Sequence, residues 1–208
     1  MKKLLFLICL CSTIAIASES NYYPNRLNCC KVTKNTVNDY EPEEFQLSNN
    51  LLRRTGQPPI YRGTKIIIKG ILLDQDCVPV SDAKIYLWQV GSDGKYPYIP
   101  LRTRINKKML NLVNKSSFTG SGTATTNNKG EFYFITIHPG KIGHGTANVN
   151  IRAEHLDIGQ LQTKLYLSNS TVDLDNCGEV GHVLANVHSG IRTYEFKVVM
   201  PGRTFKRY

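Results

Sequence analysis

Residues 65–96 read KIIIKGILLDQDCVPVSDAKIYLWQVGSDGKY, and this stretch decides the fold class. Its aliphatic and β-branched residues form two runs, 65–73 and 84–89, separated by a turn that contains Asp and Pro. Short runs of this composition between turn residues predict β-strands. A Ser-Asp-Gly turn at 92–94 then leads to Tyr96. The stretch therefore predicts two strands joined by a turn, with Tyr96 just beyond the second strand.

The chain beyond this stretch repeats the pattern of short β-rich runs between turns. Seven short strands without a strong helix between them indicate an all-β protein, a sandwich or a barrel. The insert at 101–117 is basic and rich in Asn, and it predicts a loop with one helical turn. The five further strands are predicted at 122–126, 131–138, 147–152, 163–167 and 192–200.

The N-terminus has the features of a secretory signal peptide. Lys2 and Lys3 precede an apolar run that ends near Ile16, and Ala15-Ile16-Ala17 is a small-x-small cleavage pattern. We expect cleavage after Ala17 and export to the periplasm or the cell exterior. The apolar run is short for a membrane span and no second run of spanning length follows, so no transmembrane segment is predicted. A retained N-terminal anchor is the alternative.

The length of 208 residues fits one domain after the signal peptide. The expected organisation is a signal peptide at 1–17, an irregular N-terminal arm at 18–62 and one β-sandwich domain at 63–208. The arm is polar and punctuated by Asn, Tyr and Pro. Only residues 43–54 have a faint helical pattern of apolar residues.

Four cysteines remain after removal of the signal peptide: Cys29, Cys30, Cys77 and Cys177. Export favours disulfides, because they persist outside the cytoplasm. A bridge between the neighbours Cys29 and Cys30 would be strained, so we expect one or two bridges from the arm to Cys77 and Cys177. A metal site is the alternative, although the spacing contains no CxxC pair.

The formal net charge of +10 includes Lys2 and Lys3, so the processed chain carries 10 − 2 = +8. The basic residues are spread along the chain rather than gathered into the sharp stripe of a nucleic-acid-binding protein, so no nucleic-acid partner is predicted. An exported basic protein can meet an anionic envelope surface of lipid, glycan or cell-wall polymer, or it can use its charge for solubility alone.

The pattern of residues 70–89 is more specific than a pair of strands. It reads G-x-x-x-D-x-x-x-x-P-V-x-x-A-x-I-x-x-W-Q and is followed by Asp-Gly-Lys-Tyr at 93–96. Together with NKGEFYFITIHPG at 128–140, it resembles the intradiol ring-cleavage dioxygenases, such as protocatechuate and catechol dioxygenases. The resemblance covers most of residues 63–202 and implies a β-sandwich of the intradiol dioxygenase or transthyretin-like type. Transthyretin-like binding modules share its opening motif and remain an alternative.

The resemblance implies a ferric site with two tyrosine and two histidine ligands, at which a catechol-type ring is cleaved. Tyr96 falls on the first tyrosine position, whereas Ile142 falls on the second. Asn148 and Asn150 fall on the two histidine positions. Isoleucine has no donor atom, and a neutral amide is a poor replacement for an imidazole on iron. Only one of the four ligand positions is retained, although Asn148 and Asn150 should face the same side of a strand.

The first hypothesis is therefore an exported member of this family with a lost iron site, no cofactor, and a binding or envelope role. Its small aromatic or polar ligand would be held by the pocket of Tyr96, Ile142, Asn148 and Asn150. The alternative is an active Fe(III) dioxygenase with rearranged ligands, in which His144 substitutes for a lost ligand with help from His138 or His155. Metal ligation by Tyr96 and His144 stays open at this point.

Overall fold

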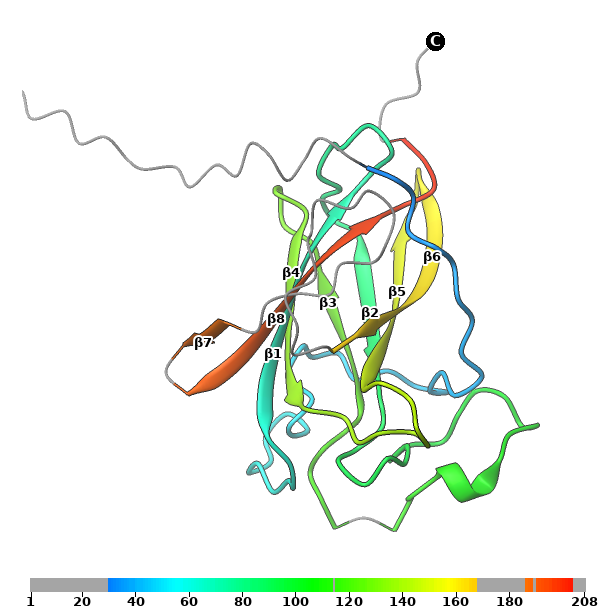
Figure 1. Ribbon diagram of the computed structural model, residues 1–208, viewed down its shortest axis with the longest axis vertical. Coiled ribbons are helices and arrows are strands. Elements are labelled where there is room, and N and C mark those ends of the chain that lie inside the picture. Colours follow the sequence, from blue (N-terminus) through cyan, green and yellow to red (C-terminus); the bar gives the residue numbers. More distant parts are fainter. Residues whose placement is uncertain (1–29, 114, 168–185, 189, 204–208) are drawn as a thin grey trace, which may run out of the picture.

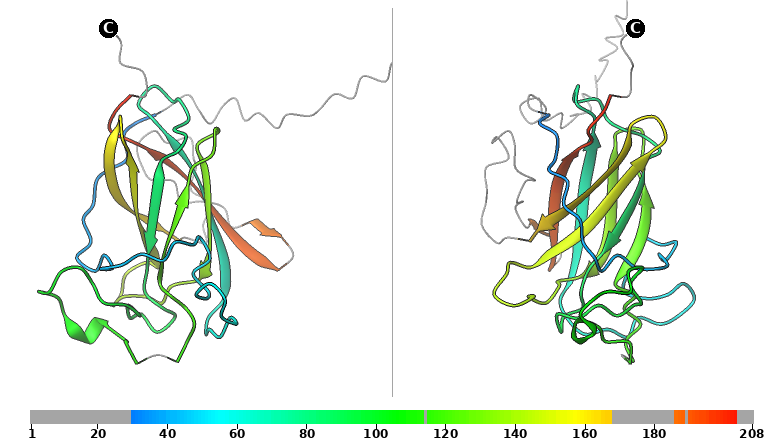
Figure 2. Two further views of the ribbon diagram at one scale, coloured as in Figure 1. Left: turned by 180° about the vertical axis from the view of Figure 1, so that it is seen from behind. Right: turned by 90° about the vertical axis from the view of Figure 1, so that its right-hand side faces the viewer.

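The computed structural model describes residues 30–113, 115–167, 186–188 and 190–203. Two four-stranded β-sheets pack face to face, in the strand orders β4-β1-β8-β7 and β3-β2-β5-β6 (Figures 1 and 2). The all-β sandwich prediction is therefore confirmed. The strands are β1 Lys65–Leu73, β2 Lys84–Trp88, β3 Ser121–Thr125, β4 Glu131–Ile137, β5 Asn148–His155, β6 Gly159–Tyr166, β7 Asn186–His188 and β8 Ile191–Val199.

The first sheet is mixed and the second is antiparallel throughout. β1 pairs antiparallel with β4 and parallel with β8, so the strand that opens the domain lies beside the strand that ends it. β2 lies between β3 and β5, and β6 completes that sheet. The connections before β1, between β2 and β3, and between β4 and β5 consequently meet at one end of the sandwich (Figure 1).

The sandwich core is made by every second residue of the facing strands, as the pleat of a β-strand requires. Ile66 and Ile68 of β1 are fully buried, and Phe132 and Phe134 lie next to them from β4. Gly70 lies opposite Phe132, and an added Cβ there would lie 2.2 Å from the Phe132 Cζ atom. Glycine at this position allows the phenyl ring to cross the strand and close the core.

Most predicted strand bounds are correct to within a few residues, and two differences have physical causes. The faint helix at 43–54 is wrong, because Asn50 instead forms a β-bridge with Ile135 at the edge of β4. The sequence also gave no signal for β7, a three-residue strand paired with β8. The helical turn predicted in the insert is confirmed as the 3₁₀ helix η1, Lys107–Met109, with Asn106 as its N-cap.

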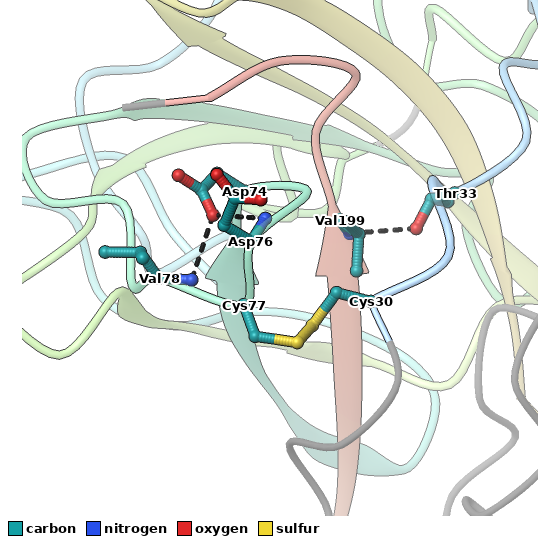
Figure 3. Close-up of a disulfide and its surroundings, with 7 residues drawn as sticks. All are labelled: Cys30, Thr33, Asp74, Asp76, Cys77, Val78 and Val199. Atoms are coloured by element: carbon teal, nitrogen blue, oxygen red, sulfur yellow. Dashed lines mark hydrogen bonds between the residues drawn. A yellow bond between two sulfur atoms is a disulfide. The ribbon is translucent and has the colours of Figure 1, made fainter. Parts of the chain in front are cut away.

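A disulfide between Cys30 and Cys77 fastens the N-terminal arm to the turn between β1 and β2 (Figure 3). Thr33 adds two hydrogen bonds to Val199 at the end of β8: its backbone N–H donates to the carbonyl, and its Oγ1 accepts from the Val199 N–H. The prediction of a bridge from the arm to Cys77 is confirmed. Cys29 and Cys177 lie outside the described residues.

The arm then crosses the outer face of the second sheet. Near β6, the Thr36 N–H donates to the Gln162 carbonyl over 2.8 Å, and the Thr163 hydroxyl donates to the Lys34 carbonyl over 2.9 Å. Its last part reaches the edge of β4, where the Ile135 N–H donates to the Asn49 carbonyl. In the part of the chain that the structure describes, no helix has the length and apolar character needed to cross a bilayer.

Candidate functional site

The second sheet carries apolar residues on both of its faces. On β2, Ile85 and Leu87 point into the sandwich core, so the alternating Tyr86 and Trp88 point outward. On β5 the core residue Val149 separates the outward-facing Asn148 and Asn150, the two positions that the family resemblance assigns to iron-binding histidines.

A second hydrophobic cluster, the aromatic cluster, covers this outer face. Trp88, Val90 and Tyr96 form its buried centre. The residues packed around them come from the arm, from β2 and from the β2–β3 connection: Tyr40, Phe45, Tyr86, Tyr98, Met109 and Leu110. The backbone of Tyr96 is fixed by hydrogen bonds to Met109 and Asn111 on either side of a bridge to Leu110. Tyr96 is therefore held rigidly between the sheet and the insert.

Asn38 of the arm links Trp88 to Tyr96. The Trp88 Nε1–H donates to Asn38 Oδ1 over 3.2 Å, and Asn38 Nδ2 donates to the Tyr96 hydroxyl over 3.4 Å. Because an indole N–H can only donate, it fixes the orientation of the Asn38 amide and makes the Tyr96 oxygen an acceptor. The Tyr40 N–H also donates to Asn38 Oδ1, which holds the arm in a tight turn here.

Tyr40 covers the face of Tyr96. Their rings are stacked with centroids 4.7 Å apart and planes inclined by 8°. Burial raises the pKa of the Tyr96 phenol above its ordinary value, and the interactions of its oxygen with Asn38 and Asn150 oppose that rise only in part. Tyr96 is therefore a neutral phenol in this environment, shielded by one arm residue and hydrogen-bonded by another.

The other three predicted pocket positions differ in their surroundings. Asn150 is buried beside Tyr96, and its Nδ2 donates to the Trp88 carbonyl. Asn148 lies two residues away on the same face, where its Nδ2 donates to the Thr146 carbonyl over 3.0 Å. Ile142 is 41% exposed, in the connection between β4 and β5. The structure thus brings Tyr96 and Asn150 together, with Asn148 nearby and Ile142 on the surface.

Two buried oxygens in this region have no hydrogen-bond partner: Asn150 Oδ1 and the hydroxyl of Tyr98. The Tyr98 ring lies beside that of Tyr96 with a centroid separation of 5.6 Å. Burial raises the pKa of Tyr98 well above its ordinary value, and electrostatic interactions with Tyr96 and Glu41 add to this effect. At pH 7 the side chains of Tyr96, Tyr98 and Asn150 are therefore uncharged hydrogen-bonding groups.

Arg152 brings the only nearby positive charge among the outward-facing side chains of β5, and it is already paired. It forms ion pairs with Glu41 of the arm and with Glu154, the latter over 2.9 Å. Its guanidinium also stacks over the Tyr86 ring, 4.3 Å from the centroid. Burial raises the pKa of Glu41, and the charge of Arg152 opposes that rise. Arg152 thus anchors the arm to the sheet.

The histidines considered as substitute ligands lie in three different environments. The His138 ring packs near Tyr194, with centroids 6.2 Å apart, and burial lowers its pKa. His144 is exposed in the connection that carries Ile142. His155 ends β5 and lies five residues beyond Asn150, about 16 Å along the strand. Within the described ranges, no three His, Cys, Asp or Glu residues are grouped closely enough to hold a metal ion.

The residues at the family's ligand positions do not fit a ferric ion. Ferric iron in this chemistry needs anionic oxygen and imidazole ligands, but the site offers a neutral phenol and amide oxygens. The phenol oxygen accepts a hydrogen bond from Asn38, and Tyr40 covers its ring. Ile142 contributes no donor atom.

Sequence reasoning missed the arm residues that complete this region, Asn38, Tyr40 and Phe45. One feature of the sequence predicts that another segment packs over the outer face of β2. Residues 85–88, Ile-Tyr-Leu-Trp, are apolar at every position, so a strand formed by them exposes apolar side chains on both faces unless another segment packs there. Nothing in the local pattern says that the arm is this segment.

A family model described as "Dioxygenase" matches residues 38–161. The match begins within the arm, at Asn38, and includes all residues of the aromatic cluster. Similar proteins include the "Putative dioxygenase" of Rickettsia bellii, 52% identical over the full length of both chains, and that of Rickettsia felis, 50% identical over the full length of both. The protocatechuate 3,4-dioxygenase beta chain of Burkholderia cepacia is 26% identical over 118 residues, which is 57% of this chain and 46% of that one.

Solved structures share the fold. The intradiol ring-cleavage dioxygenase of Tetranychus urticae superposes with a TM-score of 0.58 and 18% identity, over 82% of this chain and 95% of that one. The dioxygenase domain of a Streptomyces carbohydrate-binding fusion protein gives 0.57 and 19%, over 83% of this chain and all of that one. The motif of residues 70–96, the sandwich and the family match agree, and the chain belongs to the intradiol ring-cleavage dioxygenase family.

Proposed function

We propose that this chain is an exported binding protein of the dioxygenase family, that its ferric site has been lost, and that it does not cleave aromatic rings. The observation that carries the proposal is the state of Tyr96. Its phenol is buried, accepts a hydrogen bond from Asn38 and is covered by the stacked ring of Tyr40. The position that best retains the family's chemistry is thus built into a hydrophobic cluster.

The asparagines support the same proposal. Both occupy histidine positions, and both use their amide groups to hold backbone carbonyls, those of Trp88 and Thr146. A ligand that entered beneath the arm would meet neutral hydrogen-bonding groups and aromatic rings, which suits a small aromatic or polar molecule better than a metal ion. Export rests on the leader-like residues 1–17, and the net positive charge fits a role at an anionic envelope surface.

Iron loading tests the loss of the site. The chain, incubated with Fe(III) and separated from free iron, should stay colourless and should consume neither catechol nor oxygen. A visible phenolate-to-iron absorption band that disappears in Tyr96→Phe would refute the proposal. Oxygen uptake with catechol would establish the rival function, an active dioxygenase with rearranged ligands.

A restored variant provides the matched control. It combines Ile142→Tyr, Asn148→His and Asn150→His, and it is prepared both with Tyr40 and with Tyr40→Ala. If the missing ligands and the covering ring together keep iron out, the absorption band should be strongest in the variant that lacks the Tyr40 ring. Circular dichroism shows whether each variant keeps the β-sandwich.

A further inference from the structure

Three connections meet at the end of the sandwich beyond β2, and they are joined into one surface. The Ser117 N–H donates to the Ile60 carbonyl, which joins the connection before β1 to the β2–β3 connection. The Gly140 N–H donates to the Gly91 carbonyl over 2.9 Å, which joins the β4–β5 connection to the same unit. We call residues 53–64, 89–120 and 138–147 the basic end.

The charge of these three segments is almost entirely positive, while the arm segment that hydrogen-bonds to the middle one contributes Asp39, Glu41, Glu43 and Glu44. The three segments contain one acidic residue, Asp93, which accepts a hydrogen bond from Asn111. Arg53, Arg54 and Arg62 come from the first segment, and Lys141 comes from the third. The middle segment contributes Lys95, Arg102, Arg104, Lys107, Lys108 and Lys115. Of these, Arg102 is paired with Asp39 of the arm.

Exposed aliphatic side chains are interleaved with these basic residues. They range from 41% exposed for Ile142 to 92% for Val113. Ile142 is the residue that replaces a family tyrosine, so this position has exchanged a donor atom for an exposed apolar side chain. The exposed aliphatic residues of the basic end are Ile60, Ile99, Leu101, Leu112, Val113 and Ile142.

The opposite end of the sandwich has a different character. Its turns at 74–83, 126–130 and 156–158 contain Asp74, Asp76, Asp82 and Asp157, together with one basic residue, Lys129, and one fully exposed aliphatic residue, Leu156. Most of the basic residues and most of the exposed aliphatic residues of the described connections between strands therefore lie at the basic end. Backbone hydrogen bonds and the η1 turn hold the middle segment in shape, so it is preformed for docking.

We propose that the basic end docks on a bilayer surface that contains anionic lipid. Lys and Arg side chains are attracted to anionic headgroups, and exposed aliphatic side chains gain free energy when they enter the interface. Anionic glycans and nucleic acids would also be attracted to the basic residues. They offer no apolar phase that the aliphatic side chains could enter, and nucleic acids favour aromatic surfaces on which their bases stack. The proposal rests on the export part of the proposed function and is independent of the iron site.

Vesicle flotation tests the proposal with the exported, processed chain. Vesicles of phosphatidylcholine with about a third phosphatidylglycerol should carry the protein upward, and vesicles of phosphatidylcholine alone should not. Added salt should weaken binding, because it screens the headgroup charge. Absence of binding to the anionic vesicles at low salt would overturn the proposal. Iron titration of the same sample separates this failure from a failure of the proposed loss of the ferric site.

Paired variants locate the surface. Lys107→Gln with Lys108→Gln should lower the partition coefficient about thirtyfold, at about 1 kcal/mol for each basic residue near the membrane. Leu112→Ser with Val113→Ser should lower it at least tenfold. The control, Lys129→Gln with Leu156→Ser, changes exposed residues at the other end of the sandwich and should leave binding unchanged.

Each alternative outcome has a defined meaning. If only the lysine variant weakens binding, the surface is attracted to the headgroup charge alone, and the proposed entry of the aliphatic side chains into the bilayer interface is wrong. If the control weakens binding as much as the two loop variants do, the surface has been misplaced.

Discussion

The molecule contains two hydrophobic clusters that are built on different principles. The sandwich core lies between two sheets, and most of its residues are aliphatic side chains supplied by strands that alternate in and out. The aromatic cluster lies on the outer face of one sheet, and its cover comes from an arm and an insert that have no regular structure around Tyr40 and Tyr98. The core defines the fold, whereas the aromatic cluster contains Tyr96, the residue at a position that the family resemblance assigns to a metal ligand.

This difference teaches that the sandwich and the region around Tyr96 are held together by separate sets of contacts. In the aromatic cluster, a tyrosine that matches a metal ligand has become part of a packed, hydrogen-bonded unit. Trp88 is the single tryptophan of the chain and lies in that unit. Its fluorescence therefore reports on the aromatic cluster, while circular dichroism reports on the sheets.

The largest expected effect is in the sandwich core. Phe134→Ala should lower the free energy of unfolding by about 3–5 kcal/mol, because it removes a fully buried ring from between the sheets. Urea denaturation measures the loss, and the Trp88 emission of the folded variant should match that of the wild type. Tyr133→Ala, which removes a half-exposed side chain on the opposite face, is the control and should cost much less.

Loss of the disulfide should have the second-largest effect on stability. Cys30→Ser with Cys77→Ser opens a loop of sequence separation 47 and should cost about 2–4 kcal/mol, mainly by freeing the unfolded chain. Because the disulfide holds the arm, we expect the aromatic cluster of this variant to open at a lower urea concentration than the sandwich. A Trp88 transition that precedes the circular dichroism transition in urea would support this order, and coincident transitions would contradict it.

Removal of the covering ring should have a smaller effect. Tyr40→Ala should cost about 1–2 kcal/mol, because it removes one stacked aromatic pair and part of the cover of Tyr96. Trp88 emission should shift to longer wavelength as water enters the aromatic cluster. Tyr40→Phe keeps the ring and loses only the hydroxyl that accepts from the Asn106 N–H, so it should behave like the wild type.

The smallest effect concerns Glu41 and depends on pH. Burial raises the pKa of the Glu41 carboxyl in the folded protein above its ordinary value of 4.5, so the folded state holds this proton more tightly than the unfolded state does. The contribution of Glu41 to stability is present below pH 4.5 and is lost as the pH rises through the raised pKa. Unfolding of Glu41→Gln at a series of pH values should lack this decline, whereas the exposed Glu43→Gln should retain it.

The sequence was sufficient for the sandwich because its strands carry their own pattern. β1 has the predicted bounds, since a Gly-Thr pair precedes it and an Asp-rich turn follows it. The outward direction of Asn148 and Asn150 also followed from alternation about the core residue Val149. These features depend on neighbours in the chain and on the pleat alone.

The aromatic cluster could not be predicted in the same way because its contacts are long-range. The hydrogen bond from Trp88 to Asn38 spans 50 residues, and that from Arg152 to Glu41 spans 111. The apolar residues at 43–54 predict a faint helix, but the backbone at 49–51 pairs with Ile135 at the edge of β4. Long-range packing overrides local propensity here: Phe45 packs against Tyr86 and Trp88, while Leu51 and Leu52 join the sandwich core.

The parallel pairing of β1 with β8 also has a kinetic consequence. Ile66 lies opposite Arg192, so the first strand of the domain acquires this neighbour only when nearly the whole chain is available. Contacts between such distant segments slow folding, because the chain between them must lose conformational entropy before their pairing contributes any stability. While the last strand is still being synthesised, the first sheet lacks its central pairing, so this sheet is completed only after almost the whole chain has left the ribosome.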